Sequence, residues 1–351
     1  MPKDALEVHH FDVGDADCIL VTRWKDDQPW RLLIDGGRAS TVNRVKASLK
    51  ALDATRLDAV LCSHLDDDHA AGLVEIVADP EFEIGQGFMH VVEWHVALNE
   101  ISTRVKAAAI REEQLITASV DTNGALLTAF LSRGIKPTEP FEGVEFNGFL
   151  VCGPSRKYYE ALLGKFTSTA DLRAIDLLLE RERMQKQSSS EGKPLLVNPT
   201  ETPANNTSTI LTYDWRGARL RFTADAGLPA QRQAAAFADR KGRPLESICW
   251  MQIPHHGSRS AIDQEQIEFY RPAVAYASAA GGKNPADAVV AGFKACGSQV
   301  YCTCGATLRR SFGDAPDRGL VPATPLYHDD WESSAGGRDA IGKCNLGAIR
   351  A

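Results

Sequence analysis

The stretch SHLDDDHAAGL, residues 63–73, places two histidines and three aspartates in six consecutive positions. It continues LDAVLCS, residues 57–63, an apolar run rich in strand-forming side chains. The small residues at 70–72 allow a helix to begin close to a strand end. Solvation of an acidic turn does not explain a strand that ends there, whereas open α/β sheets place their sites at strand ends. The stretch therefore predicts a functional site.

The composition is that of an ordinary globular protein of 351 residues, 44% apolar and 24% charged. This length suffices for one large domain or two modest ones. The formal net charge of −7 argues against a generally basic nucleic-acid surface and leaves room only for a local basic groove. No apolar run approaches the roughly 18 residues that span a bilayer, and residues 1–8 do not resemble a signal peptide. We expect a cytoplasmic protein that does not bind membranes.

The chain divides into two similar halves around an insertion. Residues 1–157 read as the first half, in which strands, a helix and a further strand lead to the histidine–aspartate stretch. Residues 205–313 repeat this order and form the second half. Residues 158–204 combine charged helices with polar, Pro-rich loops, so we interpret them as an insertion. The tail at 314–351 is polar, and we expect it to be irregular.

Motifs from both halves occur in the order found in a known family. They are DVGDAD (12–17), LLIDGG (32–37), SHLDDDHAAGL, NNTSTILTY (205–213), FTADAG (222–227) and PHHGSRS (254–260). In order and strand context they resemble the metallo-β-lactamase superfamily, and look most like its ComEC-type metallohydrolases. The resemblance implies an α/β fold, namely an αββα sandwich whose two β-sheets meet at a metal centre, here with a helical insertion. It also implies hydrolysis of an ester, commonly a phosphodiester.

The resemblance implies ligands for one or two divalent metal ions. In the common pattern of the superfamily, H-x-H-x-D-H, two histidines bind one metal and the Asp-His pair binds a second. Asp66 stands here where the second histidine usually stands. Asp225 matches the aspartate that bridges the metals, and such a pair lies about 3.5 to 4 Å apart. The implied ligands are His64, Asp66, Asp68, His69, Asp225 and His256.

A further histidine that is usual in the superfamily is missing, because residues 205–208 read NNTS at its position. Asn206 either occupies that ligand position or does not bind a metal. His64 and Asp66 would then share Asp225 with a second site made of Asp68, His69, Asp225 and His256. Oxygen ligands favour Mn²⁺ or Mg²⁺ and imidazoles suit Zn²⁺, so we expect zinc first and an unequal pair with a tighter second site.

Other polar residues near the motifs have two interpretations each. Asp12, Asp17 and Asp35 resemble the family's acids that orient ligating histidines, although plain Asx turns explain them nearly as well. The choice between His255 and His256 as ligand stays open, with His256 favoured and His255 placed beside the substrate. Contact with metal or substrate, against simple surface exposure, is predicted for Asn206, Ser208, Ser258, Arg259, Lys283 and Asn284.

The mechanism follows from such a site. A metal lowers the pKa of its bound water from about 15.7 toward 7, Asp68 would accept or orient the proton, and His255 would protonate the leaving oxygen. We rank a phosphodiesterase or nuclease first, acting on nucleic acid or a nucleotide. The acidity of the chain favours a small phosphodiester, because duplex binding draws on many phosphate contacts. A hydrolase of another ester, lactone or thioester, and a non-catalytic metal-stabilised regulatory or binding protein, are the alternatives.

The insertion at residues 158–204 should have both ends near the metal centre. Its segment LRAIDLLLERERMQKQ, residues 172–187, has an apolar stripe at helical spacing and a charged end. Three alternatives stay open: a helix packed on the core without further role, a lid that holds an anionic substrate, or a contact with a second copy or another protein partner.

Overall fold

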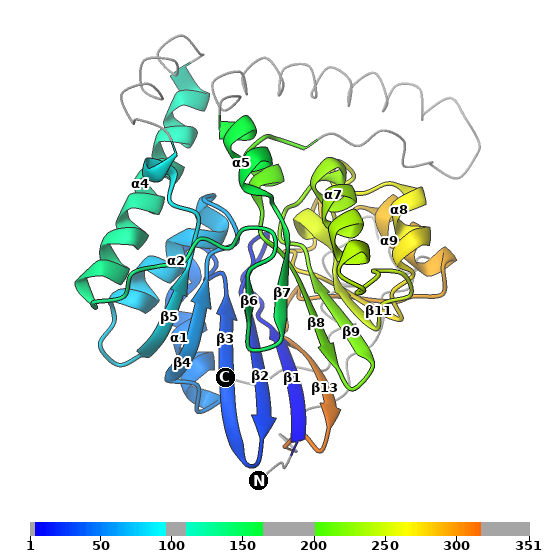
Figure 1. The fold of residues 1–351 in the computed structure, drawn as a ribbon, viewed down its shortest axis with the longest axis horizontal. Helices are drawn as coiled ribbons and strands as arrows, with labels where there is room; N and C mark the ends of the chain where they lie inside the picture. Colours follow the sequence, from blue (N-terminus) through cyan, green and yellow to red (C-terminus); the bar gives the residue numbers. More distant parts are fainter. Residues whose placement is uncertain (1–3, 96–109, 164–200, 317–351) are drawn as a thin grey trace.

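The computed structural model describes residues 4–95, 110–163 and 201–316 (Figure 1). Two β-sheets form its centre, and each contains both parallel and antiparallel strand pairs. The strand order is β13-β1-β2-β3-β4-β5 in the first sheet and β12-β11-β10-β9-β8-β7-β6 in the second. The last described strand, β13, therefore returns to pair with the first.

The first sheet begins with antiparallel strands and ends with parallel ones. A hairpin joins β2 to β3, and Asp26 and Asp27 adopt the positive φ angles that its tight turn requires (49° and 64°). β4 and β5 then run parallel to β3. The strands are β1 (Asp4–His10), β2 (Ile19–Lys25), β3 (Gln28–Ile34), β4 (Arg56–Leu61), β5 (Glu83–Phe88) and β13 (Leu308–Gly313).

The second sheet has the same division, with antiparallel pairs from β6 to β9 and parallel pairs from β9 to β12. Its strands are β6 (Glu145–Phe146), β7 (Phe149–Gly153), β8 (Ile210–Trp215), β9 (Ala218–Phe222), β10 (Trp250–Gln252), β11 (Val274–Ala277) and β12 (Gln299–Cys302). Parallel strands in both sheets mean that several strands of each sheet end at one edge.

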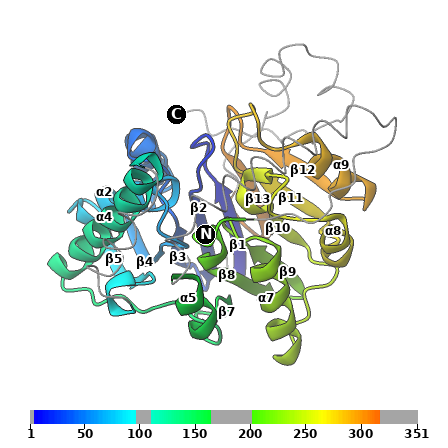
Figure 2. The ribbon, with the colours of Figure 1, turned by 90° about the horizontal axis from the view of Figure 1, so that it is seen from above.

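Helices cover the outer faces of the two sheets. In Figure 2, α2 and α4 lie on one side of the strands, and α7, α8 and α9 lie on the other. The helices are α1 (Val42–Ala51), α2 (Asp67–Ala78), α4 (Ile110–Ser132), α5 (Arg156–Leu163), α7 (Leu228–Arg240), α8 (Gln264–Tyr270) and α9 (Asp287–Ala295). Short 3₁₀ helices are η1 (Ala39–Thr41), η2 (Val92–Trp94), η4 (Asn205–Thr207) and η5 (Pro254–Gly257).

Buried side chains form three apolar layers, as an αββα sandwich requires. One layer lies between the sheets and includes Leu61 from the first and Phe222 and Trp250 from the second. A second layer joins the first sheet to α1, α2 and α4, and a third joins the second sheet to α7, α8 and α9. The predicted fold class, two mixed sheets flanked by helices, is confirmed.

The expected helices and strands agree with the structure in most places. The helix expected in the first half, before the strand that leads to the histidine–aspartate stretch, is α1. Strands β5 and β13 and helix α8 were not predicted. Residues 164–200 and 317–351, which include the segment 172–187 and most of the tail, lie outside the described residues. Among the described helices, none has the length and apolarity to cross a membrane.

Candidate metal centre

The candidate site lies where strands of both sheets end. Asp35 follows β3, and residues 63–69 follow β4, which runs parallel to β3. Asp225 follows β9, and η5 follows β10, again from parallel neighbours. Carboxyl ends of parallel strands meet at one edge of a sheet, so this topology brings together segments that are distant in the sequence.

Glycines explain how α2 comes so close to the loop after β3. A Cβ atom added to Gly72 would lie 2.0 Å from the backbone oxygen of Gly36, a distance that no side chain tolerates. Backbone hydrogen bonds join the two segments, from Gly36 N to His69 O and from Gly72 N to Gly37 O, each 2.8 Å long. The small residues after the histidine–aspartate stretch therefore serve close packing, which positions His69 against the end of β3.

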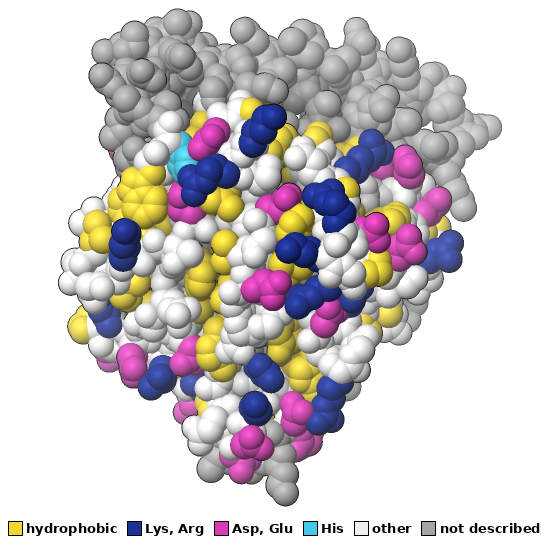
Figure 3. Space-filling model, viewed as in Figure 1, with side chains coloured by type: hydrophobic (Ala, Val, Ile, Leu, Met, Phe, Trp, Pro, Cys, Tyr) yellow, Lys and Arg dark blue, Asp and Glu magenta, His cyan; other side chains and the backbone are white. Residues whose placement is uncertain are grey.

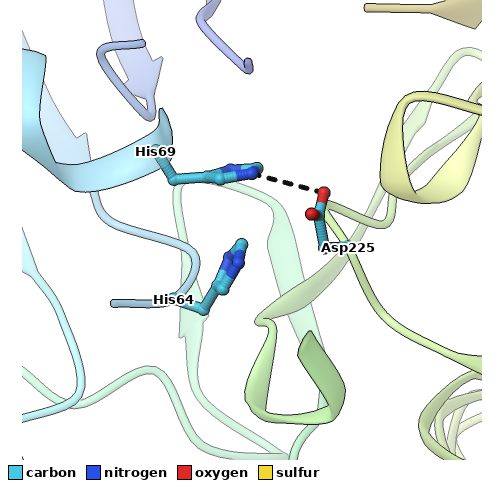
Figure 4. Close-up of side chains that lie close together, drawn as sticks. All are labelled: His64, His69 and Asp225. Carbon is cyan, nitrogen blue, oxygen red and sulfur yellow. Dashed lines mark ion pairs between the residues drawn. The ribbon is translucent and has the colours of Figure 1, made fainter. Parts of the chain in front are cut away.

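His64, His69 and Asp225 form one buried group (Figure 4). One potential ligand atom from each lies within 4.8 Å of the others. His69 Nε2 is 3.3 Å from Asp225 Oδ1, and the rings of His64 and His69 have centroids 4.1 Å apart. The two histidines come from the first half of the chain and the aspartate from the second.

Three further groups overlap with the first. They are Asp68–His69–His256, Asp17–Asp225–His256 and Asp17–Asp35–His69. His256 Nε2 lies 3.7 Å from Asp68 Oδ2 and equally far from Asp225 Oδ2. The structure thus brings together five of the six predicted ligands, all except Asp66, in these groups. Asp66 Oδ2 lies 3.7 Å from His64 Nε2, on a partly exposed side chain.

The chemistry of these atoms fits a divalent metal. Nε2 of His64, His69 and His256 and Oδ1 of Asp225 are all buried, and none of these atoms forms a hydrogen bond within the part of the chain that the structure describes. Burying a polar atom without a partner costs free energy, so buried groups of this kind are ordinarily paired or bind a metal. Imidazole nitrogens and carboxylate oxygens are the ligands that Zn²⁺ accepts. The residues present therefore fit one or two such ions.

Asp35 binds the ring nitrogen of His69 that does not face Asp225. Its Oδ2 accepts a hydrogen bond from His69 Nδ1 at 2.8 Å, and Ser63 donates to the same carboxylate through its backbone N (2.7 Å) and its Oγ (2.6 Å). With Nδ1 donating, the Nε2 lone pair of His69 is directed toward Asp225. A carboxylate behind a histidine is the usual partner of a metal-ligating imidazole.

Gln252 connects Asp17 with the segment before Asp225. The amide Nε2 of Gln252 donates to Asp17 Oδ2 at 2.7 Å, while its Oε1 accepts from the backbone N of Thr223 (2.9 Å) and of Ala224 (3.0 Å). All of these groups are buried. One side chain thereby joins the first motif of the chain to the loop that carries Asp225.

The pKa values of Asp225 and His69 are shifted in opposite directions. Burial alone would raise the pKa of Asp225, but His255, His256 and His69 outweigh burial and hold that pKa well below its usual value. Burial lowers the pKa of His69, yet Asp225 and Asp35 raise it well above its usual value. Asp225 therefore stays ionised, as a metal ligand must.

His255 and His256 stand on an unusual backbone. Their φ angles are 46° and 56°, and Gly257 follows at 86°, so three consecutive residues occupy the left-handed region. A Cβ atom on Gly257 would lie 2.5 Å from Cβ of Pro285. This turn points the two rings in different directions, with an interplanar angle of 71°.

His255 bonds to a carboxylate that lies outside all the motifs. Its Nδ1 is 2.6 Å from Glu201 Oε1, and its Nε2 is 3.6 Å from Asp225 Oδ2. Burial lowers the pKa of His255, but Glu201 and Asp225 outweigh it and raise the pKa to about 10. The side chain of His255 remains 27% exposed, so the ring is within reach of a substrate.

Arg38 supplies a cation at the edge of the centre. Its NH2 donates to Asp68 Oδ2 at 3.0 Å and to the backbone oxygen of Asp15 at 3.3 Å. Half of the Arg38 side chain is exposed (50%). This guanidinium therefore stands between the potential ligand Asp68 and the solvent.

Several predicted residues have other contacts. Asp12 accepts from Gly14 N at 3.4 Å, as in an Asx turn, and its Oδ2 lies 3.7 Å from Arg44. Asn206 donates to the backbone oxygens of Glu201 and Thr202, while its Oδ1 is buried without a partner. The recorded contacts of Asp12 thus lie away from the four groups.

The remaining predicted residues show three kinds of environment. The Oγ of Ser208 is buried and forms no hydrogen bond with any residue that the structure describes, whereas that of Ser258 lies 2.7 Å from Ser260 Oγ. Arg259 and Lys283 are exposed, and Asn284 is half-buried in front of Pro285.

Four residues at the centre were missed by the sequence analysis: Ser63, Arg38, Glu201 and Gln252. Ser63 is the first residue of its motif and Gln252 precedes another by two residues, and a polar side chain at the end of an apolar strand was a usable signal. Arg38 directly follows the Asp-Gly-Gly turn. Glu201 lies in a polar loop, where a single glutamate carries no signal.

Comparison of the chain with family models and with curated proteins finds no match. Among solved structures, it is similar to the metallo-β-lactamase fold protein YhfI from Bacillus subtilis, with 11% identity, a TM-score of 0.45, and coverage of 88% of this chain and 100% of that one. It is also similar to the hydrolase AbOPH of the β-lactamase superfamily, with 13% identity, a TM-score of 0.35, and coverage of 60% and 56%.

A third similar structure is AidC, a dizinc quorum-quenching lactonase in complex with its product, with 14% identity, a TM-score of 0.31, and coverage of 64% of this chain and 67% of that one. Similarities this low carry no argument about activity, and they do not support the ComEC-type subgroup in particular. The chemistry of the site therefore rests on its own residues, which gather histidine and aspartate ligand atoms between two mixed sheets.

Proposed function

We propose that this protein is a metal-dependent hydrolase of the metallo-β-lactamase superfamily, that it resembles the ComEC-type members, and that it cleaves a phosphodiester. The observation that carries the proposal is the set of overlapping buried groups around His69 and Asp225. Buried nitrogen and oxygen atoms in these groups form no hydrogen bond among the described residues, and Asp35 accepts a hydrogen bond from the other ring nitrogen of His69.

The ligand roles follow from the groups. His64, His69, Asp68, Asp225 and His256 would hold one or two ions, and Zn²⁺ fits this donor set best, with Mn²⁺ or Mg²⁺ as alternatives. When bound, the metal supplies a nucleophile from water near neutral pH and offsets negative charge that develops on the substrate.

The chain's own residues would do the remaining work. Asp68, whose Oδ2 faces both Arg38 and His256, would accept or orient the proton of the attacking water. His255 would donate a proton from Nε2 to the leaving oxygen. Arg38 would bind an anionic oxygen of the substrate, because a guanidinium pairs well with phosphate.

The charge distribution supports a small phosphodiester rather than duplex nucleic acid. On the face drawn in Figure 3, Lys and Arg side chains alternate with Asp and Glu side chains among the described residues. The chain as a whole carries a formal charge of −7. Duplex binding gains most of its affinity from many phosphate contacts, which favour a basic surface.

The test is a substrate panel for protein reconstituted separately with Zn²⁺, Mn²⁺ and Mg²⁺. Bis-p-nitrophenyl phosphate, single- and double-stranded DNA, RNA and a lactone would be offered in parallel. We expect cleavage of the phosphodiester, and its loss in Asp68→Ala. Turnover of the lactone alone would replace the phosphodiesterase proposal by the other-ester alternative, and no turnover with any metal would favour a non-catalytic protein.

A further inference from the structure

We propose that Glu201 is a positioning residue for catalysis, which acts by holding His255 with its Nε2 directed at the substrate side of the metal centre. This inference rests on the proposed function, since it assigns a partner to the histidine that donates the proton. The evidence is the arrangement of hydrogen bonds around one buried carboxylate.

Glu201 is buried and has more than one donor. Its side chain is only 2% exposed, and its Oε1 accepts from His255 Nδ1 at 2.6 Å. Ser260 Oγ donates to the same oxygen in a very short hydrogen bond. Asn205 Nδ2 donates to Oε2 at 2.7 Å. A carboxylate held by three neighbours cannot rotate freely, so it fixes the ring that it binds.

The backbone leaves room for this carboxylate beside Asp225. A Cβ atom added to Gly227, two residues after Asp225, would lie 2.6 Å from Cβ of Glu201. The stem of Glu201 therefore occupies space that only a glycine at position 227 provides. In this way the end of the expected insertion, residues 201–204, is packed against the loop that carries Asp225.

The bond to Glu201 determines which nitrogen of His255 is presented to the substrate. An ionised carboxylate only accepts hydrogen bonds, so Nδ1 must carry a proton and Nε2 points toward Asp225, 3.6 Å away. In the imidazolium form of His255, Nε2 carries a second proton. As the bond from phosphorus to the leaving oxygen breaks, this proton passes to that oxygen and leaves His255 neutral, with the Nδ1 proton still hydrogen-bonded to Glu201. The attacking water forms the new bond to phosphorus and gives its proton to Asp68, so the charges balance.

The same geometry separates His255 from the metal ligands. His256 belongs to two of the four potential ligand groups, whereas His255 belongs to none. Loss of Glu201 should therefore reduce proton donation without removing the metal. A merely structural role would instead lower stability or metal content.

The kinetic test compares wild type and Glu201→Gln on aryl phosphodiesters whose leaving groups range from p-nitrophenol to phenol. General acid catalysis contributes roughly 10²- to 10⁴-fold, mainly for poor leaving groups. We expect kcat of Glu201→Gln to fall at least about tenfold for phenyl esters and to change little for p-nitrophenyl esters. KM and metal content should be unchanged, and Glu201→Asp should recover part of the loss.

A double variant shows whether Glu201 acts through His255. Once His255→Gln has removed the proton donor, Glu201→Gln should cause little further loss, because residues that act as a unit are not additive. Glu139→Gln is the matched control, since Glu139 Oε1 binds His95 Nε2 at the same 2.6 Å in a part of the molecule away from the site. We expect wild-type kinetics from that control.

A magnetic-resonance readout does not depend on activity. The imidazole proton on Nδ1 of His255 should appear strongly downfield in the metal-loaded protein, and should be absent from both Glu201→Gln and His255→Gln but present in Glu139→Gln. An unchanged downfield proton in Glu201→Gln, equal kinetic losses for all leaving groups, or loss of metal would overturn the role of Glu201. Absence of any diester turnover by the wild type would overturn the proposed function instead, while the magnetic-resonance result still decides the positioning.

Discussion

The two sides of the candidate metal centre orient their histidines by different means. On the first side, residues 63–69 have no positive φ angle, and His69 is oriented by a direct 2.8 Å bond to Asp35. On the second side, His255, His256 and Gly257 all have positive φ angles, and His256 Nδ1 is 3.8 Å from Asp17. A direct side-chain hydrogen bond orients the ligand histidine His69, whereas His256 has only a longer contact with Asp17 and stands on a left-handed backbone.

Substitutions on the two sides should therefore have different consequences. A left-handed conformation costs roughly 1–2 kcal/mol for each residue that has a Cβ atom, so the turn at His255 and His256 needs support from surrounding packing. Residues 63–69 have no such conformation, although Asp35 itself has a φ angle of 58°. The orientation of His69 should therefore be lost when the acceptor Asp35 is removed. Substitutions on the two sides should therefore fail in different ways, through metal affinity on the first and through stability on the second.

The largest effect is expected where the two sides meet. Asp225 contacts His69, His255 and His256, and Asp225→Asn removes the charge that all three face. We expect metal binding and hydrolysis to be lost, because a ligand should matter more than an outer partner, whose removal costs about 10- to 100-fold. Equilibrium dialysis with elemental analysis measures this, and full stoichiometric metal in Asp225→Asn would refute the assignment of Asp225 as a ligand.

The second expected effect compares Asp35 with Asp17. Asp35→Asn weakens the direct bond to His69 and should lower metal affinity about 10- to 100-fold. Asp17→Asn should lower it less, because the carboxylate of Asp17 approaches His69 and His256 only to 3.7 Å and 3.8 Å. Competition with a chromogenic chelator gives both affinities. A greater loss in Asp17→Asn would reverse the comparison between the two sides.

The third effect belongs to the second side. Gly257→Ala combines a φ angle of 86° with a Cβ position 2.5 Å from Pro285, so it should lower the free energy of unfolding by roughly 1–3 kcal/mol. Gly297→Ala shares the positive φ angle (84°) but has open space around it, and Gly282→Ala has open space without a positive φ angle. Urea unfolding of metal-loaded protein should rank the losses as 257, then 297, then 282. Equal losses of unfolding free energy in Gly257→Ala and Gly297→Ala would show that the close approach to Pro285 adds no cost.

The smallest expected effect is the pH dependence of stability that comes from His90, a buried histidine near the first side. His90 lines a cavity of about 10 Å³ with Cys62 and His64, and burial lowers the pKa of His90 to about 3. Since an unfolded histidine titrates near pH 6.5, the stability from neutral His90 is complete above that pH and declines as the pH falls toward 3. The decline is at most about 1.4 kcal/mol per pH unit.

His90→Phe tests this dependence, because it retains a ring against Tyr159 but cannot take up a proton. The difference in unfolding free energy between wild type and His90→Phe should shift in favour of the variant from pH 7 to pH 5. A difference that does not change with pH would show that His90 is not held neutral by the fold.

The features that could be predicted are those that depend on residues close together in the sequence. The apolar runs and their turns predicted strands and helices, while the sandwich and the ligands came from the family resemblance of the motifs. The ligand residues of the first side lie within one short motif, from His64 to His69. The residues that hold the site side chains in place on both sides are brought there by tertiary packing. Glu201 reaches His255 across 54 positions, and Gln252 reaches Asp17 across 235. No periodicity or motif connects such pairs.

The same reasoning explains the unpredicted strand β13. Residues 308–313 lie at the end of the predicted second half, where no strand was expected, and their pairing with β1 makes them a strand. Asp12 shows the opposite case, since its motif resembled a site acid while its hydrogen bond to Gly14 N is the local Asx turn that the sequence also allowed.

Anomalous diffraction from crystals grown with Zn²⁺, with data collected on both sides of the zinc absorption edge, tests the central claim most directly. The account predicts one or two zinc peaks enclosed by His64, His69, Asp225, Asp68 and His256, at about 2.0–2.2 Å from the ligating nitrogen and oxygen atoms. It also predicts that the peak next to His69 is lost or weakened in Asp225→Asn. A crystal that contains zinc at surface sites but none between these residues would contradict the claim that the cluster is a metal centre.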